Sequence, residues 1–159
     1  MPPTEGETIG DFEAVLCDGE TFRSATLSDV LGSRGGIVVS TGFAFSAIAQ
    51  NWWKRFVRAG WNEFEDVPVL GVSRDGPYAQ NEFLRWLDQP GFRFFADVNG
   101  VVSESLDLLA DRSHMAGVST PWRSAFVLGP DRTVTYAFVA DDWISPLPRE
   151  EIEAAVAEL

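Results

Sequence analysis

A chain of 159 residues with 45% hydrophobic and 23% charged residues has the size and composition of one folded domain, not of a disordered segment. Its 24 acidic residues outnumber the 12 basic ones, and the resulting net charge of -12 disfavours nucleic-acid binding. No run of about 18 apolar residues is present, so we expect no membrane span. The first residues lack the basic and apolar regions of a secretory signal, which favours a cytoplasmic location.

The N-terminal part predicts a β-hairpin and a short helix. The turn pair Asp18-Gly19 separates residues 12–17 from residues 21–23, a pattern typical of two antiparallel strands. Residues 26–31 predict a short helix, after which Gly32 ends the pattern.

A buried strand followed by a loop and a helix comes next. The β-branched run 37–40 is typical of a parallel strand covered on both faces. Residues 41–46 form a loop, and Ser46 is suited to cap a helix over residues 47–59.

Strands and helices continue to alternate toward the C-terminus. The predicted elements are a strand over 67–73, a helix over 77–87, a strand over 92–96, a helix over 101–109, a hairpin of strands 124–128 and 133–139, and a helix over 149–158. This order predicts one α/β domain over residues 1–159, with a mixed central sheet and helices on both faces. Ligands of such folds bind beyond the carboxyl ends of parallel strands, which directs attention to residues 40–50.

Cys17 and His114 are the only residues of their types, which excludes several kinds of site. A single cysteine allows no intrachain disulfide, CxxC motif or cysteine zinc cluster, and we expect neither a metal nor a cofactor. A Ser–His–Asp triad would need His114, whose neighbours show no nucleophile-elbow pattern. We expect a structural role for His114, and for Cys17 the role of a small buried hydrophobe.

Residues 38–49 resemble the active-site segment of peroxiredoxins of the alkyl hydroperoxide reductase and thiol-specific antioxidant (AhpC/TSA) superfamily. That segment reads proline, three residues, threonine or serine, two residues, cysteine; here the three positions hold Gly42, Ser46 and Ala49. A distant arginine that enters a strand in the family is matched by Arg123. The order of elements agrees over nearly the whole chain, so the resemblance implies a thioredoxin-like fold with an N-terminal β-hairpin.

The resemblance also implies a chemistry that this chain lacks. In the family, a thiolate at the start of a helix attacks a peroxide held by the hydroxyl and the arginine, and becomes a sulfenic acid. Here Ser46 and Arg123 are retained and Ala49 carries no sulfur. We therefore predict a non-catalytic binding, scaffolding or regulatory homologue, in which a small anion or polar ligand lies between the helix N-terminus and Arg123.

The resemblance predicts the rest of the pocket and leaves alternatives open. We expect the pocket to include Gly42, Phe43 and Phe45. Of Trp52 and Trp53, we expect one in the core and the other at the pocket or at a subunit contact. One alternative is an antioxidant thiol peroxidase in which Ala49 is an engineered replacement of the catalytic cysteine. Another is a structural partner that dimerises with itself or with an active relative; family analogy implies a homodimer.

The ratio of arginine to lysine is unusual, since 11 of the basic residues are arginine and Lys54 is the only lysine. Scarce lysine and abundant carboxylates resemble halophilic proteins, which suggests a haloarchaeal-type member of the family. Salt screens the mutual repulsion of so many like charges.

We expect the protein to gain stability as potassium chloride or sodium chloride rises to molar concentration, because screening relieves the repulsion within a chain of net charge -12. Thermal melts across a salt series measure this effect. A midpoint that is unchanged or lower at high salt would contradict the halophilic interpretation.

Overall fold

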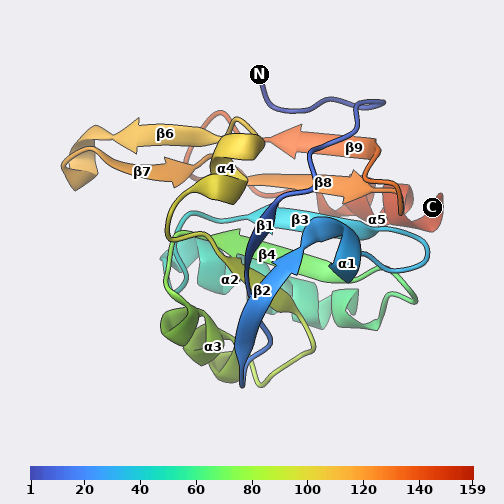
Figure 1. The fold of residues 1–159 in the computed structure, drawn as a ribbon, viewed down its shortest axis with the longest axis horizontal. Coiled ribbons are helices and arrows are strands. Elements are labelled where there is room, and N and C mark those ends of the chain that lie inside the picture. Colours follow the sequence, from blue (N-terminus) through green and yellow to red (C-terminus); the bar gives the residue numbers. More distant parts are fainter.

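The computed structural model describes residues 1–159 and places a seven-stranded mixed sheet at the centre of the molecule (Figure 1). The strands lie in the order β2-β1-β5-β4-β3-β8-β9. β3, β4 and β5 run parallel to one another, and every other neighbouring pair in this sheet is antiparallel. In chain order the strands are β1 (Glu13–Cys17), β2 (Phe22–Thr26), β3 (Gly36–Ser40), β4 (Val69–Ser73), β5 (Arg93–Ala96), β6 (Leu109–Arg112), β7 (Val118–Pro121), β8 (Ser124–Leu128) and β9 (Val134–Val139).

Helices cover both faces of the sheet, as the sequence predicts. The helices are α1 (Leu27–Val30), α2 (Ala47–Arg58), α3 (Pro77–Trp86), α4 (Val101–Ser105) and α5 (Arg149–Ala157), with single 3-10 turns at Trp61–Glu63 and Ser113–Met115. Alternate side chains of a strand belong to opposite faces, so Ile37 and Val39 pack with α2, α3 and α5, whereas Val38 packs with α1 and α4. Every residue of β3 and β4 is buried, which explains their continuous apolar sequence.

Aromatic rings fill the space between α2 and the sheet. Trp53 has no exposed surface and packs against Phe94, with ring centroids 4.5 Å apart. Phe56, one turn further along the helix, stacks on Trp61 at 4.0 Å. This packing fixes α2 firmly on the sheet, and with it the position of the helix N-terminus.

The structure corrects one predicted helix and adds a hairpin that the sequence analysis missed. The helix predicted over 101–109 ends at Ser105, because Asp107 adopts a left-handed conformation with φ 54° that a helix cannot continue through. β6 and β7 then pair antiparallel as a separate two-stranded sheet. These four-residue strands mix polar and apolar residues without a clear period-2 alternation, so their pattern did not predict strands.

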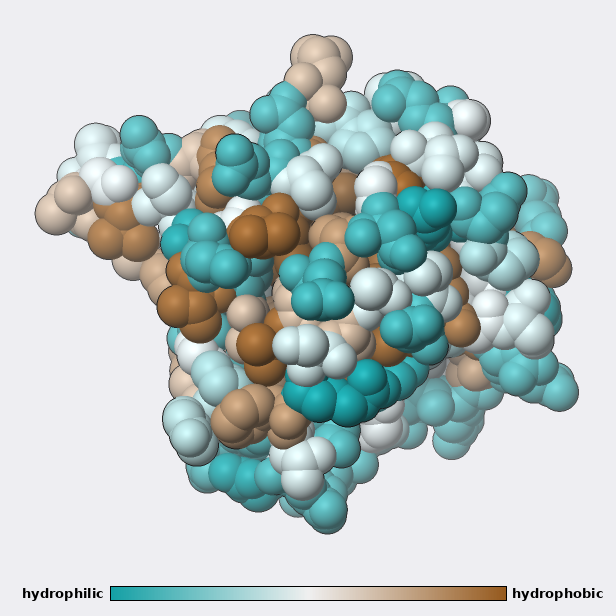
Figure 2. All heavy atoms as spheres, viewed as in Figure 1, coloured by the Kyte–Doolittle hydropathy of each residue, from teal (hydrophilic) through white to brown (hydrophobic).

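This hairpin projects from the body of the molecule (Figure 1) and carries hydrophobic atoms on its surface (Figure 2). Met115 and Val118 are its exposed apolar side chains. No helix of the protein is long and apolar enough to cross a membrane.

Candidate functional site

The loop between β3 and α2 has a backbone shape that depends on two left-handed residues. Gly42 has a φ of 77°, and its carbonyl accepts the Arg74 N–H at 2.8 Å. Proline could not occupy position 42 in this conformation, because its ring holds φ near -65°. Phe45 also has a positive φ, 63°, and its ring packs edge-on against that of Phe83 in α3, with centroids 5.0 Å apart.

Ser46 begins α2 as the predicted N-cap. Its Oγ accepts the Ala49 N–H at 3.2 Å, which satisfies one of the free donors in the first turn. The backbone N–H groups of Ala47 and Ile48 make no hydrogen bond within the protein. The start of this 12-residue helix therefore presents free donors and the positive end of the helix dipole.

A cavity of about 160 Å³ lies at this helix end, between the loop, the β6–β7 hairpin and Trp143. Of the side chains expected from the sequence, those of Phe43, Ser46 and Arg123 line it, as does the Gly42 backbone. These residues come from two distant parts of the chain, so the fold brings together the main elements of the predicted site.

Four of the expected residues do not line this cavity. Ala49 is fully buried and belongs, like Trp53, to the core cluster between α2 and the sheet. The Phe45 ring packs against Phe83 of α3. Trp52 borders a different hollow, between α2 and the start of α5, and belongs partly to the core. Of the residues expected at the site, Gly42, Phe43, Ser46 and Arg123 therefore line this cavity, and Trp53 is the tryptophan that lies in the core.

Arg123 is buried, with 4% of its surface exposed, and most of its donors are used within the protein. Nη1 donates to the Ser145 carbonyl at 2.5 Å, while Nη2 donates to the Asp142 carbonyl at 2.9 Å and to its Oδ1 at 3.0 Å. The guanidinium carbon lies 4.9 Å from the centroid of the Trp52 ring. The Nε of Arg123 is buried and has no hydrogen-bond partner. Burial lowers the pKa of Arg123, and the charge of Asp142 opposes that shift.

Asp142 is therefore the counter-ion of Arg123, and it lies in the loop that joins β9 to α5. Its carboxylate also accepts the Ser145 hydroxyl and the Ser145 backbone N–H, at 2.8 Å for the latter. These hydrogen bonds to Ser145 are the main reason that the pKa of Asp142 lies below its usual value, with a smaller contribution from Arg123. The carboxylate thus folds its own loop and neutralises the arginine.

Sequence analysis missed a second buried arginine at the cavity, Arg112 of β6. Only 3% of its surface is exposed, and its Nε donates to Thr120 Oγ1 at 2.6 Å. Its guanidinium carbon lies 3.5 Å from the Trp143 ring centroid and 4.6 Å from that of Trp122. The two tryptophan rings stack on each other at 4.7 Å. Asp111 and Ser113 flank Arg112 in the sequence, so no apolar pattern marked it as a buried strand residue.

His114, for which a structural role was expected, also borders the cavity, from the tip of the hairpin. Its ring packs edge-on against Trp143, with centroids 6.1 Å apart. The three ionisable side chains that line the cavity are therefore His114, Arg112 and Arg123, and all are basic. In a chain of net charge -12 this local excess of donors favours an anion.

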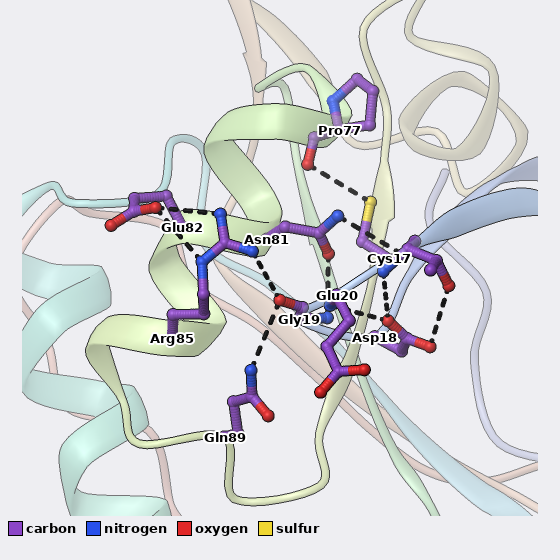
Figure 3. A network of polar contacts seen from close by, with 10 residues as sticks. Cys17, Asp18, Gly19, Glu20, Pro77, Asn81, Glu82, Arg85 and Gln89 are labelled. Carbon is purple, nitrogen blue, oxygen red and sulfur yellow. Dashed lines mark hydrogen bonds and ion pairs between the residues drawn. The ribbon is translucent and has the colours of Figure 1, made fainter.

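Cys17, the only thiol, is remote from this cavity. It lies in β1 with no exposed surface, and its Sγ points toward the Pro77 carbonyl at 3.8 Å (Figure 3). The adjoining turn is tied to α3, because the Gly19 N–H donates to Asn81 Oδ1 at 2.8 Å. Burial, and to a lesser extent the charge of Asp18, raise the pKa of Cys17 to about 12. The thiol is therefore protonated at neutral pH.

We expect Asp142→Asn to lower the thermal midpoint at neutral pH, because it leaves the buried guanidinium of Arg123 without a counter-ion. The folded-state pKa of Asp142 lies below the usual 3.8. Its charge therefore stabilises the fold fully above pH 3.8, and this contribution declines as the pH falls from there toward the folded-state pKa. Thermal melts of both proteins between about pH 3 and pH 7 measure the difference.

The neighbouring Asp141 provides the control for this experiment. It is exposed and forms no ion pair, so Asp141→Asn should melt close to the unmodified protein. Equal effects of the two substitutions would show that loss of a surface charge, and not loss of the Arg123 counter-ion, explains the result.

Comparison with known proteins supports the family resemblance. The model of the AhpC/TSA family matches residues 6–137. A search of curated proteins found no match.

Solved structures similar to this chain include three peroxiredoxins. A cysteine-to-serine mutant of peroxiredoxin 6 from Arenicola marina is 18% identical, covers 98% of this chain and 72% of its own, and has a TM-score of 0.83. The reduced 2-Cys peroxiredoxin of Plasmodium vivax is 18% identical over 99% of this chain and 82% of its own, with a TM-score of 0.79. AhpC of Mycobacterium tuberculosis is 17% identical over 99% of this chain and 93% of its own, also with a TM-score of 0.79.

These similarities confirm the expected thioredoxin-like fold with a mixed sheet and helices on both faces. The family match extends over more than half of the chain, so the protein belongs to the AhpC/TSA family of the peroxiredoxin superfamily.

Proposed function

We propose that this protein is a peroxiredoxin-fold binding protein without peroxidase chemistry, and that it holds a small anion at the N-terminus of α2. One observation carries the proposal: a cavity at that helix end is lined by three ionisable side chains, Arg112, His114 and Arg123, and all three are basic. Free backbone donors at Ala47 and Ile48 add to the attraction for negative charge.

The absence of a usable thiol supports the non-catalytic part of the proposal. Ala49 stands where the family pattern places the cysteine, and a methyl group cannot attack a peroxide. Cys17 is buried on another part of the sheet, and its raised pKa leaves negligible thiolate at neutral pH. Arg123, which the family pattern assigns to peroxide binding, is instead paired with Asp142.

The shape of the loop supports the same conclusion. The family pattern has proline at position 42, but this chain has glycine in a left-handed conformation. The difference at position 42 is therefore accompanied by a different backbone geometry, in addition to the missing sulfur at Ala49. Two separate departures at one site favour a binding role over a catalytic one.

The proposal also includes an oligomeric state and a cellular environment. Family analogy supports a homodimer, and the acidic, lysine-poor composition supports a salt-rich cytoplasm. A binding site in such a setting must compete with dissolved ions. Burial of both arginines helps, since salt screens buried charges much less than exposed ones.

The purified protein should show no thiol-dependent peroxidase activity, because its only sulfur nucleophile is buried and protonated. Peroxide consumption with a dithiol or thioredoxin reductant is the measurement, with Cys17→Ala as the matched control. Turnover that disappears in Cys17→Ala would assign catalysis to Cys17 and overturn this proposal.

Placing a thiol at position 49 tests whether the anion-stabilising environment exists. In the double variant Cys17→Ala, Ala49→Cys, we expect the single thiol to have a pKa below the ordinary value of about 8.5. Position 49 lies in the first turn of α2 and one turn before Trp52, over which the guanidinium of Arg123 lies. The rate of alkylation measured against pH gives the pKa.

A cysteine at the exposed position Ala47, in the same Cys17→Ala background, is the control, because it shares the helix end but not the buried face. A pKa at or above about 8.5 at position 49 would show that no anion-stabilising environment surrounds it. Peroxide turnover by the Ala49→Cys variant would instead support the alternative of an active thiol peroxidase whose cysteine has been replaced.

A further inference from the structure

The two arginines at the cavity differ in how their charge is balanced. Arg123 forms an ion pair with Asp142 and donates to two backbone carbonyls. Arg112 forms no ion pair with any carboxylate of the protein. A buried cation without a counter-ion is unfavourable, so the charge of Arg112 is the one that an external anion would compensate.

The hydrogen bonds of Arg112 leave one end of its guanidinium free. Nε donates to Thr120 Oγ1, and Nη2 donates to the carbonyls of Thr120 and Pro121 at 3.4 and 3.3 Å. Nη1 makes no hydrogen bond within the protein, although the side chain is 97% buried and lines the cavity. The free N–H donors of Nη1 thus belong to a guanidinium that the protein holds in place at the lining of the cavity.

The aromatic rings around Arg112 hold it in place. Trp143 and Trp122 stack on each other, and the guanidinium lies over both rings. Cation–π contacts orient the planar group while leaving its edge available for hydrogen bonds. Burial lowers the pKa of Arg112 from its usual value, but an arginine remains charged at neutral pH.

The lining of the cavity also has an apolar part. Phe43, Ile48 and Met115 contribute apolar surface, and no acidic side chain lines the cavity. A strongly hydrated inorganic ion would gain little binding free energy from contact with these apolar side chains. A small organic acid fits both the guanidinium and the apolar lining. Its planar carboxylate matches the geometry of a guanidinium, and its hydrocarbon part buries apolar area.

We propose that Arg112 binds the carboxylate of a small organic acid in this cavity, with the apolar part of the ligand against Phe43, Ile48 and Met115. This inference rests on the proposed anion-binding function and names the ligand class and the residue that selects it. Arg123 then serves to position the loop that carries Trp143, through its bonds to Asp142 and Ser145.

Benzoate is a suitable probe, and benzamide is its uncharged counterpart of nearly the same shape. Binding is followed by two-dimensional NMR of the tryptophan indole N–H signals at constant potassium chloride, with Trp143→Phe used to assign the indole of Trp143. We expect benzoate to shift the Trp143 signal and to bind at least about tenfold more tightly than benzamide, since a hydrogen bond to a charged group contributes this much.

Three variants test which arginine binds the carboxylate of benzoate. Arg112→Gln should weaken benzoate binding by about ten- to one-hundredfold, and Arg112→Lys should lose less because it keeps the charge. Arg74→Gln is the matched control: Arg74 donates to the Ser119 carbonyl of the same hairpin at 2.8 Å but does not line the cavity. Its benzoate affinity should stay within about twofold of the unmodified protein.

The outcomes separate this inference from the proposed function. Absence of binding of both benzoate and sulfate to the unmodified protein overturns the anion site itself. Benzoate binding that persists in Arg112→Gln and is lost in Arg123→Gln keeps the anion site and overturns the role of Arg112. Sulfate binding as tight as that of benzoate overturns the organic ligand class. Should Arg112→Gln fail to fold, the affinities for benzoate and benzamide are compared in the unmodified protein and in Arg112→Lys. This comparison still decides whether Arg112 selects the carboxylate.

Discussion

The buried guanidinium of Arg123 connects three segments that surround the candidate site. It extends from the start of β8, lies over the Trp52 ring of α2, and donates to the loop that precedes α5. A charge removed from water in this way needs a counter-ion and hydrogen-bond acceptors nearby. Asp142 and the Ser145 carbonyl provide them, so the loop between β9 and α5 is held close to the helix. The position of Trp143, and therefore the outer wall of the cavity, follows from this contact.

The same fold gives the two arginines of the cavity different roles. Arg123 is satisfied by the protein and serves the structure, whereas Arg112 keeps unused donors. Both are buried to a similar extent, so exposure does not distinguish them. The difference lies in where the carboxylates are: the loop after β9 presents Asp142 to one arginine and an aromatic ring, Trp143, to the other. In our proposal, Arg123 therefore has a structural role and Arg112 binds the ligand.

The strand–loop–helix unit at residues 36–58 is common to many α/β proteins, but its details here differ from the family pattern. Gly42 and Phe45 both take left-handed conformations, and the Ala44 N–H donates to Asp75 at 2.6 Å. The loop is therefore shaped by a glycine and by contacts to the segment after β4. Ala49, in the first turn of the helix, completes an environment with free donors and no nucleophile.

Local patterns in the sequence were sufficient for the seven strands of the central sheet, most helices and the cap of α2. The apolar runs of β3 and β4, the turn at residues 129–132 and Ser46 each act through neighbours close in the chain, so they could be recognised without coordinates. The short hairpin β6–β7 could not, because its four-residue strands mix polar and apolar residues and pair only with each other. Only the tertiary structure decided how the arginines are used, since Arg112 meets Trp143 and Arg123 meets Asp142 across separations of about 20 to 30 residues. The balance of a buried charge depends on which distant side chains the fold brings to it, and no local pattern encodes that.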